Sequence, residues 1–244
     1  MEPLWIVALA TVLATLPAAL GVLPGRGPER VPAQWLGWAN ASAAGLMLGG
    51  AFVLAERGLG LAPLTGMLGV TVGIGVVMLA HGWLGTEEEG LNRQDLTDDG
   101  YGGRVLAVQT LHGALEGVAV GMAAVLDLGL GLFLALTFAI HNAAEGAVLC
   151  AVLRSVGSGA GRAASLAVVS NAGQPLLAVA TFALLEPGGH LASGALGVAT
   201  GSLVYLVTVD LLPEAYKQAG EMSIALVTSL LMGVVLLLRG TLLP

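Results

Sequence analysis

The chain has 244 residues, of which 56% are hydrophobic and 10% are charged, whereas an average soluble domain has roughly 25% charged residues. So few charges cannot solvate such an apolar chain, which excludes an ordinary soluble enzyme, a nucleic-acid binder and a disordered chain. The composition predicts an all-α polytopic protein of the inner membrane, with the lipid bilayer as its surroundings. The net charge of −7 arises mostly from one loop and the chain ends and indicates no partner.

Apolar runs long enough to cross a bilayer as helices follow one another from end to end, so residues 1–244 are predicted to form a single transmembrane domain. The runs lack two-residue alternation and are about twice too long for the strands of a membrane barrel. Eight transmembrane helices are expected at 3–23, 35–56, 61–84, 105–126, 129–153, 163–185, 190–212 and 222–243. Turn-forming or charged residues separate them, among them Glu56-Arg57-Gly58 and Asp127-Leu128-Gly129. No Lys or Arg precedes the first run, which argues against a signal peptide.

The basic residues indicate how the spans are oriented. Connections after the first, third, fifth and seventh spans carry seven of the nine Lys and Arg residues, and the opposite side carries two. The side richer in Lys and Arg normally faces the cytoplasm, so both termini are expected outside it. The longest connection, 85–104, is then a cytoplasmic loop rich in carboxylates. It is either a solvated loop or a patch that attracts cations near a pore exit.

Ionisable side chains within a membrane span are costly and are candidates for function. The fourth and fifth spans each contain H-x-x-x-E-G near the middle, as His112 to Glu116 and as His141 to Glu145. Residues four apart share one helix face, so each span offers one imidazole and one carboxylate. Two His and two Glu suit Zn²⁺, Fe²⁺ or Mn²⁺, and two carboxylates cancel the charge of the ion. The alternative, contacts that only hold helices together, is weakened by the second copy at matching depth.

Residues next to these motifs refine the prediction. Asn142 lies three residues before Glu145, so Glu145 can belong to one site and also border a neighbouring one. The corresponding residue of the fourth span, Gly113, has no side chain. The glycine after each Glu is expected to let a neighbouring helix approach closely. Asn40, in the second span, is read as a helix contact, and the lone Cys150 excludes a disulfide within the chain.

These residues resemble the ZIP family (Zrt/Irt-like metal transporters), in particular its bacterial branch. That family has eight helices, and its fourth and fifth carry H-N-x-P-E-G and (H/Q)-(N/D)-x-P-E-G, which build a two-metal site. The segments 43–48 (AAGLML) and 203–214 (LVYLVTVDLLPE) are similar to its second and seventh helices. The resemblance implies a ZIP-like bundle with both termini outside the cytoplasm and Met47 beside the metal site. It also implies that Gln174 stands where the family usually offers a Glu ligand.

The chain departs from the family pattern at the proline and at two ligand positions. Leu115 and Ala144 replace the prolines, which should reduce helix kinks. Gly113 and Gln174 leave the second site depleted. The predicted metal ligands are His112, Glu116, His141 and Glu145 with Met47 for a first site, and Glu116, Asn142, Glu145 and the neutral Gln174 for a second. We therefore predict one tightly bound ion per chain.

The predicted function is secondary transport of divalent metal cations toward the cytoplasm, with Zn²⁺ first and Fe²⁺, Mn²⁺ and Cd²⁺ as further candidates. The metal is a substrate, and no cofactor is expected. His81, Asp210 and Glu214 would guide the ion out, unless they are only solvated residues at the membrane interface.

Two other functions remain open at this point. The weakened second site suits a metal sensor that does not transport. An intramembrane metalloenzyme would use an open metal position to activate water, but no H-E-x-x-H occurs in the chain, so we expect no enzyme. No nucleic-acid partner is expected, and a homodimer is left open.

Overall fold

The computed structural model describes residues 2–23, 31–84, 101–185 and 189–242, and every regular element in these ranges is helical. The elements are α1 (Glu2–Thr15), η1 (Leu16–Val22), α2 (Ala33–Leu61), α3 (Pro63–Leu84), α4 (Tyr101–Leu126), α5 (Leu128–Ser155), α6 (Ala160–Ser170), α7 (Gly173–Leu184), α8 (Gly189–Leu206), η3 (Val207–Leu211), α9 (Leu212–Gln218) and α10 (Glu221–Leu242). The predicted all-α fold is confirmed. The predicted loop 85–104 lies mostly outside the described residues, since α4 already begins at Tyr101.

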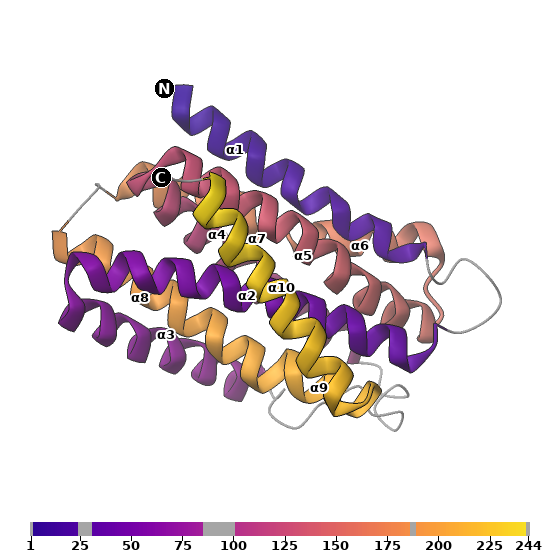
Figure 1. The fold of residues 1–244 in the computed structure, drawn as a ribbon. Helices are drawn as coiled ribbons and strands as arrows, with labels where there is room; N and C mark the ends of the chain where they lie inside the picture. Colours follow the sequence, from indigo (N-terminus) through magenta and orange to yellow (C-terminus); the bar gives the residue numbers. More distant parts are fainter. Residues whose placement is uncertain (1, 24–30, 85–100, 186–188, 243–244) are drawn as a thin grey trace.

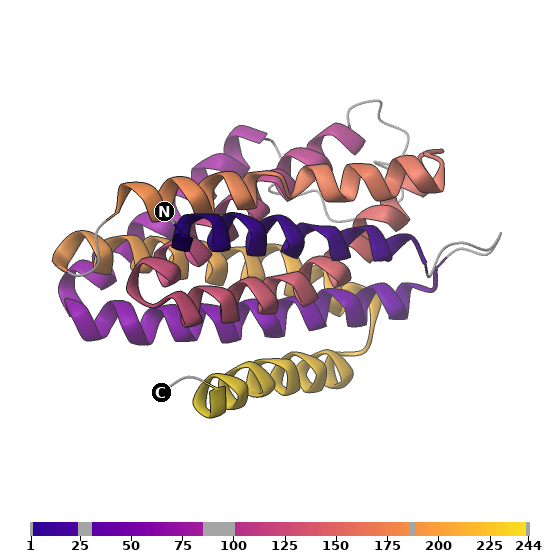
Figure 2. The same ribbon diagram turned by 90° about the horizontal axis from the view of Figure 1, so that it is seen from above.

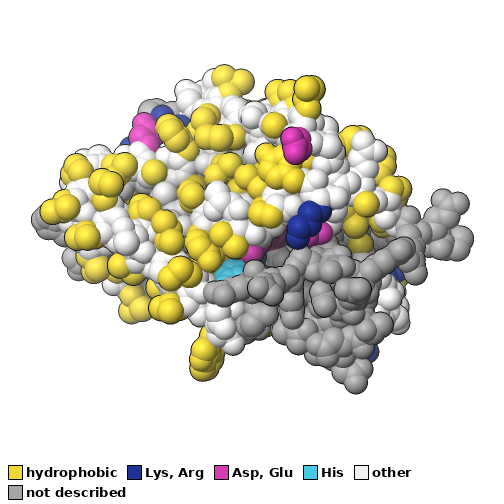
Figure 3. Space-filling model, turned by 90° about the horizontal axis from the view of Figure 1, so that it is seen from below, with side chains coloured by type: hydrophobic (Ala, Val, Ile, Leu, Met, Phe, Trp, Pro, Cys, Tyr) yellow, Lys and Arg dark blue, Asp and Glu magenta, His cyan; other side chains and the backbone are white. Residues whose placement is uncertain are grey.

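The helices run side by side in one elongated bundle, and the two chain ends lie at the same end of it (Figure 1). The last helix, α10, packs along α2 at the margin of the bundle, as the view from above shows (Figure 2). On the described part of the face in Figure 3, hydrophobic side chains are widespread and few charged ones lie between them. Lipid rather than water suits such a surface.

Seven helical segments among the described residues are long and apolar enough to cross a membrane. They are Pro3–Val22, Ala33–Leu61, Pro63–Trp83, Leu128–Ser155, Ala160–Leu184, Leu191–Gln218 and Glu221–Leu242. The fourth predicted span, α4, is not among them, although it is 26 residues long and belongs to the same bundle. The structure thus supports an α-helical membrane protein with seven candidate spans.

One predicted separator is confirmed and another is wrong. The chain reverses at Asp127, whose Oδ1 accepts a hydrogen bond of 2.7 Å from the Leu130 amide and caps α5. In contrast, α2 runs through Glu56-Arg57-Gly58 to Leu61. Arg239 pairs with Glu56 at 3.2 Å, and Ser193 donates a hydrogen bond to the Gly58 carbonyl. Because distant residues satisfy these polar groups, the helix has no need to end there.

Two predicted spans are irregular where polar residues occur. The sixth is divided at Asn171 into α6 and α7. The seventh contains the π-helical turn η3, which carries Asp210, and continues through Pro213 as α9. Turns of the π type occur mostly as bulges inside α-helices, frequently at functional sites.

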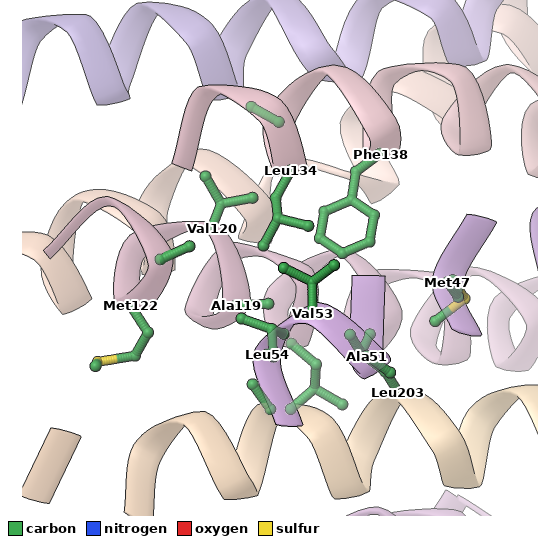
Figure 4. Packing of buried hydrophobic residues seen from close by; sticks show 14 of the residues in the cluster. Met47, Ala51, Val53, Leu54, Ala119, Val120, Met122, Leu134, Phe138 and Leu203 are labelled. Carbon is green, nitrogen blue, oxygen red and sulfur yellow. The ribbon is translucent and has the colours of Figure 1, made fainter. Parts of the chain in front are cut away.

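A buried apolar cluster joins α2, α4, α5 and α8 (Figure 4). Phe138 and Leu134 of α5 point toward Val53 and Leu54 of α2, and Leu203 reaches the same cluster from α8. The cluster fixes the α4–α5 pair against α2. Both motif helices pass Leu115 and Ala144 without interruption, where the family pattern has proline.

Candidate metal centre

Two helices that follow each other in the chain bring the two H-x-x-x-E-G motifs together. The single residue Asp127 connects α4 to α5, which pack against each other. A hairpin of this kind aligns residues at equal distances from the turn. Gln109 and Glu145 both lie 18 residues from Asp127, and the Gln109 amide donates a hydrogen bond to Oε2 of Glu145. The hairpin register thus sets both motifs at similar depth.

Three of the predicted ligands form one compact, buried group. The Nε2 atom of His141 lies 2.8 Å from Oε1 of Glu116 and 3.2 Å from Oε1 of Glu145. One ligand atom from each of the three residues lies within 4.8 Å of the others. Ligand atoms around tetrahedral zinc are roughly 3.3 Å apart, because each lies about 2.0–2.1 Å from the ion. The spacing of this group can therefore accommodate such an ion.

Hydrogen bonding orients His141 for metal binding. Its Nδ1 lies 3.2 Å from the Ala43 carbonyl of α2, and a carbonyl can only accept a hydrogen bond. With the ring proton on Nδ1, a neutral imidazole directs the lone pair of Nε2 at the two carboxylates. Metal-binding histidines commonly have this arrangement, in which a carbonyl fixes the tautomer. Three acceptors that face one another repel unless a positive charge lies among them, which is either a metal ion or a proton on Nε2 of His141.

Sequence reasoning missed Gln109. Its hydrogen bond holds one oxygen of Glu145 while the other oxygen faces His141. The equal spacing around Asp127 was the signal that could have found it. A side chain that fixes a ligand carboxylate in this way restricts the geometry of the site.

His112 lies apart from the three-residue group. Its Nε2 is 3.7 Å from Oδ2 of Asp210, and its Nδ1 is 3.0 Å from the Val108 carbonyl. His112 is buried, on the α4 face that carries Glu116 one turn later. Its predicted role as a ligand of the first site stays a prediction.

Neutral amides occupy the predicted second site. The side-chain amide of Asn142 donates to the side-chain oxygen Oε1 of Gln174 at 3.0 Å and to the backbone carbonyl of Ala14 at 2.9 Å. Asn142, Gln174 and Asn171 are all buried. Sequence reasoning did not place Asn171 here, beside the backbone of Gly113. Asn142 and Gln174 thus lie together as expected and share one hydrogen bond, but they add no negative charge, and Oδ1 of Asn142 and Nε2 of Gln174 have no hydrogen-bond partner among the described residues.

Met47 is fully buried in the apolar cluster, one turn after Ala43, whose carbonyl faces His141. Met47 therefore lies in the part of α2 that borders the centre. Its role as a ligand stays a prediction. Asn40 donates to Gln218 of α9 at 3.2 Å, as expected for a helix contact.

The glycine that follows each Glu lies where another backbone passes closely, as predicted. A Cβ on Gly117 would lie 2.9 Å from Cα of Gln174, and a Cβ on Gly146 would lie 2.7 Å from Cα of Ala18. Both distances are shorter than ordinary contacts, so neither position has room for a side chain. These glycines allow α7 and η1 to pack against the motif helices.

We expect Gly146→Ala to lower the free energy of unfolding by about 1–3 kcal/mol, because the added methyl group meets backbone that cannot move aside easily. Thermal and denaturant unfolding of the detergent-solubilised protein measure the change. Gly233→Ala in α10 is the matched control, since nothing lies within 4 Å of a Cβ there. Equal stability of the two variants would contradict the close approach of η1 to α5.

No model of a known protein family matches this chain, and no curated protein matches it. The resemblance to the ZIP family consequently rests on the motifs quoted from the sequence.

Proposed function

We propose that this protein is a ZIP-like secondary transporter that moves divalent metal cations, zinc first among them, toward the cytoplasm. The observation that carries the proposal is the buried contact of His141 with Glu116 and Glu145 in the middle of an apolar bundle. Two ionised carboxylates at that depth are expensive without a counter-charge. A divalent cation supplies the two positive charges that balance them.

The surroundings of the centre support transport rather than a fixed structural metal. The sixth predicted span is discontinuous at Asn171, between α6 and α7, and the amides beside this break lie next to the motif helices. Transporters commonly build substrate sites near the bilayer midplane from discontinuous helices. In the proposed transport cycle, two groups of spans move against each other and expose the site to either side.

We propose that α4 is the eighth span. It is 26 residues long, and His112 and Glu116, the ionisable residues whose side chains are described in it, are buried rather than exposed to lipid. Both chain ends lie at one end of the bundle (Figure 1), as an even number of crossings requires. The distribution of Lys and Arg supports an orientation in which that end lies outside the cytoplasm.

A topology reporter fused after Pro244 should therefore be active only outside the cytoplasm. The same reporter inserted in the 85–100 connection should be active only inside it, which provides the internal control. The measurement is a pair of enzyme fusions, one of them functional only in an oxidising compartment and the other only in the cytoplasm. Cytoplasmic activity of the fusion after Pro244 would contradict the proposed orientation or the number of spans.

The test of function is uptake of radioactive Zn²⁺ into proteoliposomes that contain the purified protein. We expect uptake that saturates with Zn²⁺ concentration and that competing Mn²⁺ or Cd²⁺ reduces, against liposomes without protein as the baseline. Tight Zn²⁺ binding without any flux across the bilayer would refute transport and favour a sensor.

A further inference from the structure

We infer that the neighbouring ends of α2 and α10 bind the headgroup phosphate of an anionic phospholipid, which Arg57 and Arg239 hold. Of the nine Lys and Arg residues, these are the two that the sequence predicts on the side poor in basic residues. A charged side chain near lipid is costly unless it reaches a partner. The inference depends on the membrane setting of the bundle and not on metal transport, so each proposal can fail without the other.

The packing of α10 along α2 brings these two helix ends together, although they are distant in the sequence. A Cβ on Gly49 would lie 2.6 Å from Cβ of Val235, so the two helices pass very close to each other. Further along both helices, Nη2 of Arg239 lies 3.2 Å from Oε2 of Glu56. Arg57 is the next residue of α2, so both arginines belong to the same end of the bundle.

This end of the bundle carries more positive than negative charge. Glu56 pairs with Arg239, whereas Arg57 makes no ion pair within the described residues. The Nε atoms of both arginines are buried, and neither has a hydrogen-bond partner in the part of the chain that the structure describes. Two guanidinium groups and one carboxylate leave a net charge of +1. Donors that are withdrawn from water and unpaired are costly, so an anion is favoured here.

The two arginines reach this end from different directions. Gly50 faces Leu134 of α5, and Arg57 follows Gly50 by about two helical turns, so it lies on the same side of α2. Gly49, which faces α10, lies about 100° away around the helix. A phosphate would therefore lie where α5 and α10 meet over α2. At the left end of the largely apolar face in Figure 3, basic side chains lie beside an acidic one.

The chemistry and the depth of this end suit a phospholipid. A guanidinium group presents a planar fork of N–H donors that matches phosphate, and a phosphate diester carries one negative charge, which balances the excess. Arg239 lies in the last turn of α10, and Arg57 lies just before the last turn of α2, where a span reaches the headgroups. The apolar side chains exposed at this level, which would contact the acyl chains, include Leu59, Leu61, Leu238 and Leu242.

The test is photo-crosslinking of the purified protein in phosphatidylcholine nanodiscs that contain a trace of phosphatidylglycerol with a photoreactive group beside its headgroup. Mass spectrometry of the peptides locates the label. We expect labelling at the ends of α2 and α10, and Arg57→Gln should reduce it at least about fivefold, because the variant loses both the charge and the donor fork. Equal labelling of these ends in the parent and in folded Arg57→Gln protein would overturn the inference.

Three controls define the occupant. Arg162→Gln makes the same change at an exposed arginine of α6 and should leave the labelling of α2 and α10 unchanged. A phosphatidylcholine probe with the same photoreactive group has no net charge and should label these ends more weakly than the phosphatidylglycerol probe. Inorganic phosphate in excess should not displace the lipid, because it lacks the acyl chains. Equal labelling by both probes, or complete displacement by inorganic phosphate, would overturn an anionic lipid as the occupant.

Thermal unfolding gives an independent signal. A ligand that binds the folded state raises the unfolding temperature. Phosphatidylglycerol added to the detergent-solubilised protein should therefore raise the unfolding temperature of the parent more than that of Arg57→Gln, whereas an equal rise in both would contradict the site. Neither readout involves a metal ion, so the absence of Zn²⁺ flux would leave this test intact.

Discussion

Replacement of Glu145 by Ala or Gln should abolish tight Zn²⁺ binding and Zn²⁺ uptake. The carboxylate is a candidate ligand and supplies half of the negative charge of the centre, which Glu116 alone cannot replace. The change to Ala also removes the oxygen that accepts the Gln109 hydrogen bond. We expect affinity to fall at least about 100-fold, or about 2.8 kcal/mol. Equilibrium dialysis and proteoliposome uptake measure the two effects separately.

Two variants serve as controls for this result. Glu56→Gln removes a carboxylate that pairs with Arg239 and has no contact with the centre, so it should retain tight binding. Gln109→Ala should have a smaller effect than either change at Glu145, because it removes only a group that orients the carboxylate. Parent-like affinity in folded Glu145→Ala protein would refute the centre built on α4 and α5.

The central pairing was predictable from the sequence because it is local. The H-x-x-x-E-G motifs occur in consecutive spans joined by a short turn at Asp127, so a hairpin is the simplest way to bring Glu116 to His141. The same register predicts the contact of Gln109 with Glu145, although Gln109 lies outside both motifs. The four-residue spacing of His and Glu and the position of the turn at Asp127 therefore suffice to predict this part of the site.

Contacts between distant parts of the chain were not predictable in the same way. The approach of His112 to Asp210 joins α4 to the π-helical turn η3, which no residue pattern marks. The end of α2 was misplaced for a similar reason. Glu56 resembles a loop residue until its partner Arg239, near the other end of the chain, is known. Local propensity gives no information about such partners.

Replacement of Gln174 by Glu should change the number of ions that the chain binds tightly. The parent chain is expected to bind one ion tightly, because two divalent ions bring four positive charges, whereas Glu116 and Glu145 supply two negative ones. Gln174 accepts a hydrogen bond from Asn142 at 3.0 Å, and its own Nε2 has no hydrogen-bond partner among the described residues. Gln174→Glu thus retains the acceptor, loses no hydrogen bond of the described structure and adds the missing type of ligand.

We expect Gln174→Glu to raise the number of tightly bound Zn²⁺ ions from one toward two per chain. Elemental analysis of the purified protein, with and without the change, measures this count. Gly113→Asn would also supply a family-like ligand, but a Cβ there would lie 2.9 Å from Oδ1 of Asn171, so it is the poorer variant. Two tight ions in the parent protein would show that neutral amides are sufficient ligands. A count that stays at one after Gln174→Glu would mean that Asn142 and Glu145 do not face a common ion, because the added carboxylate removes the shortage of charge.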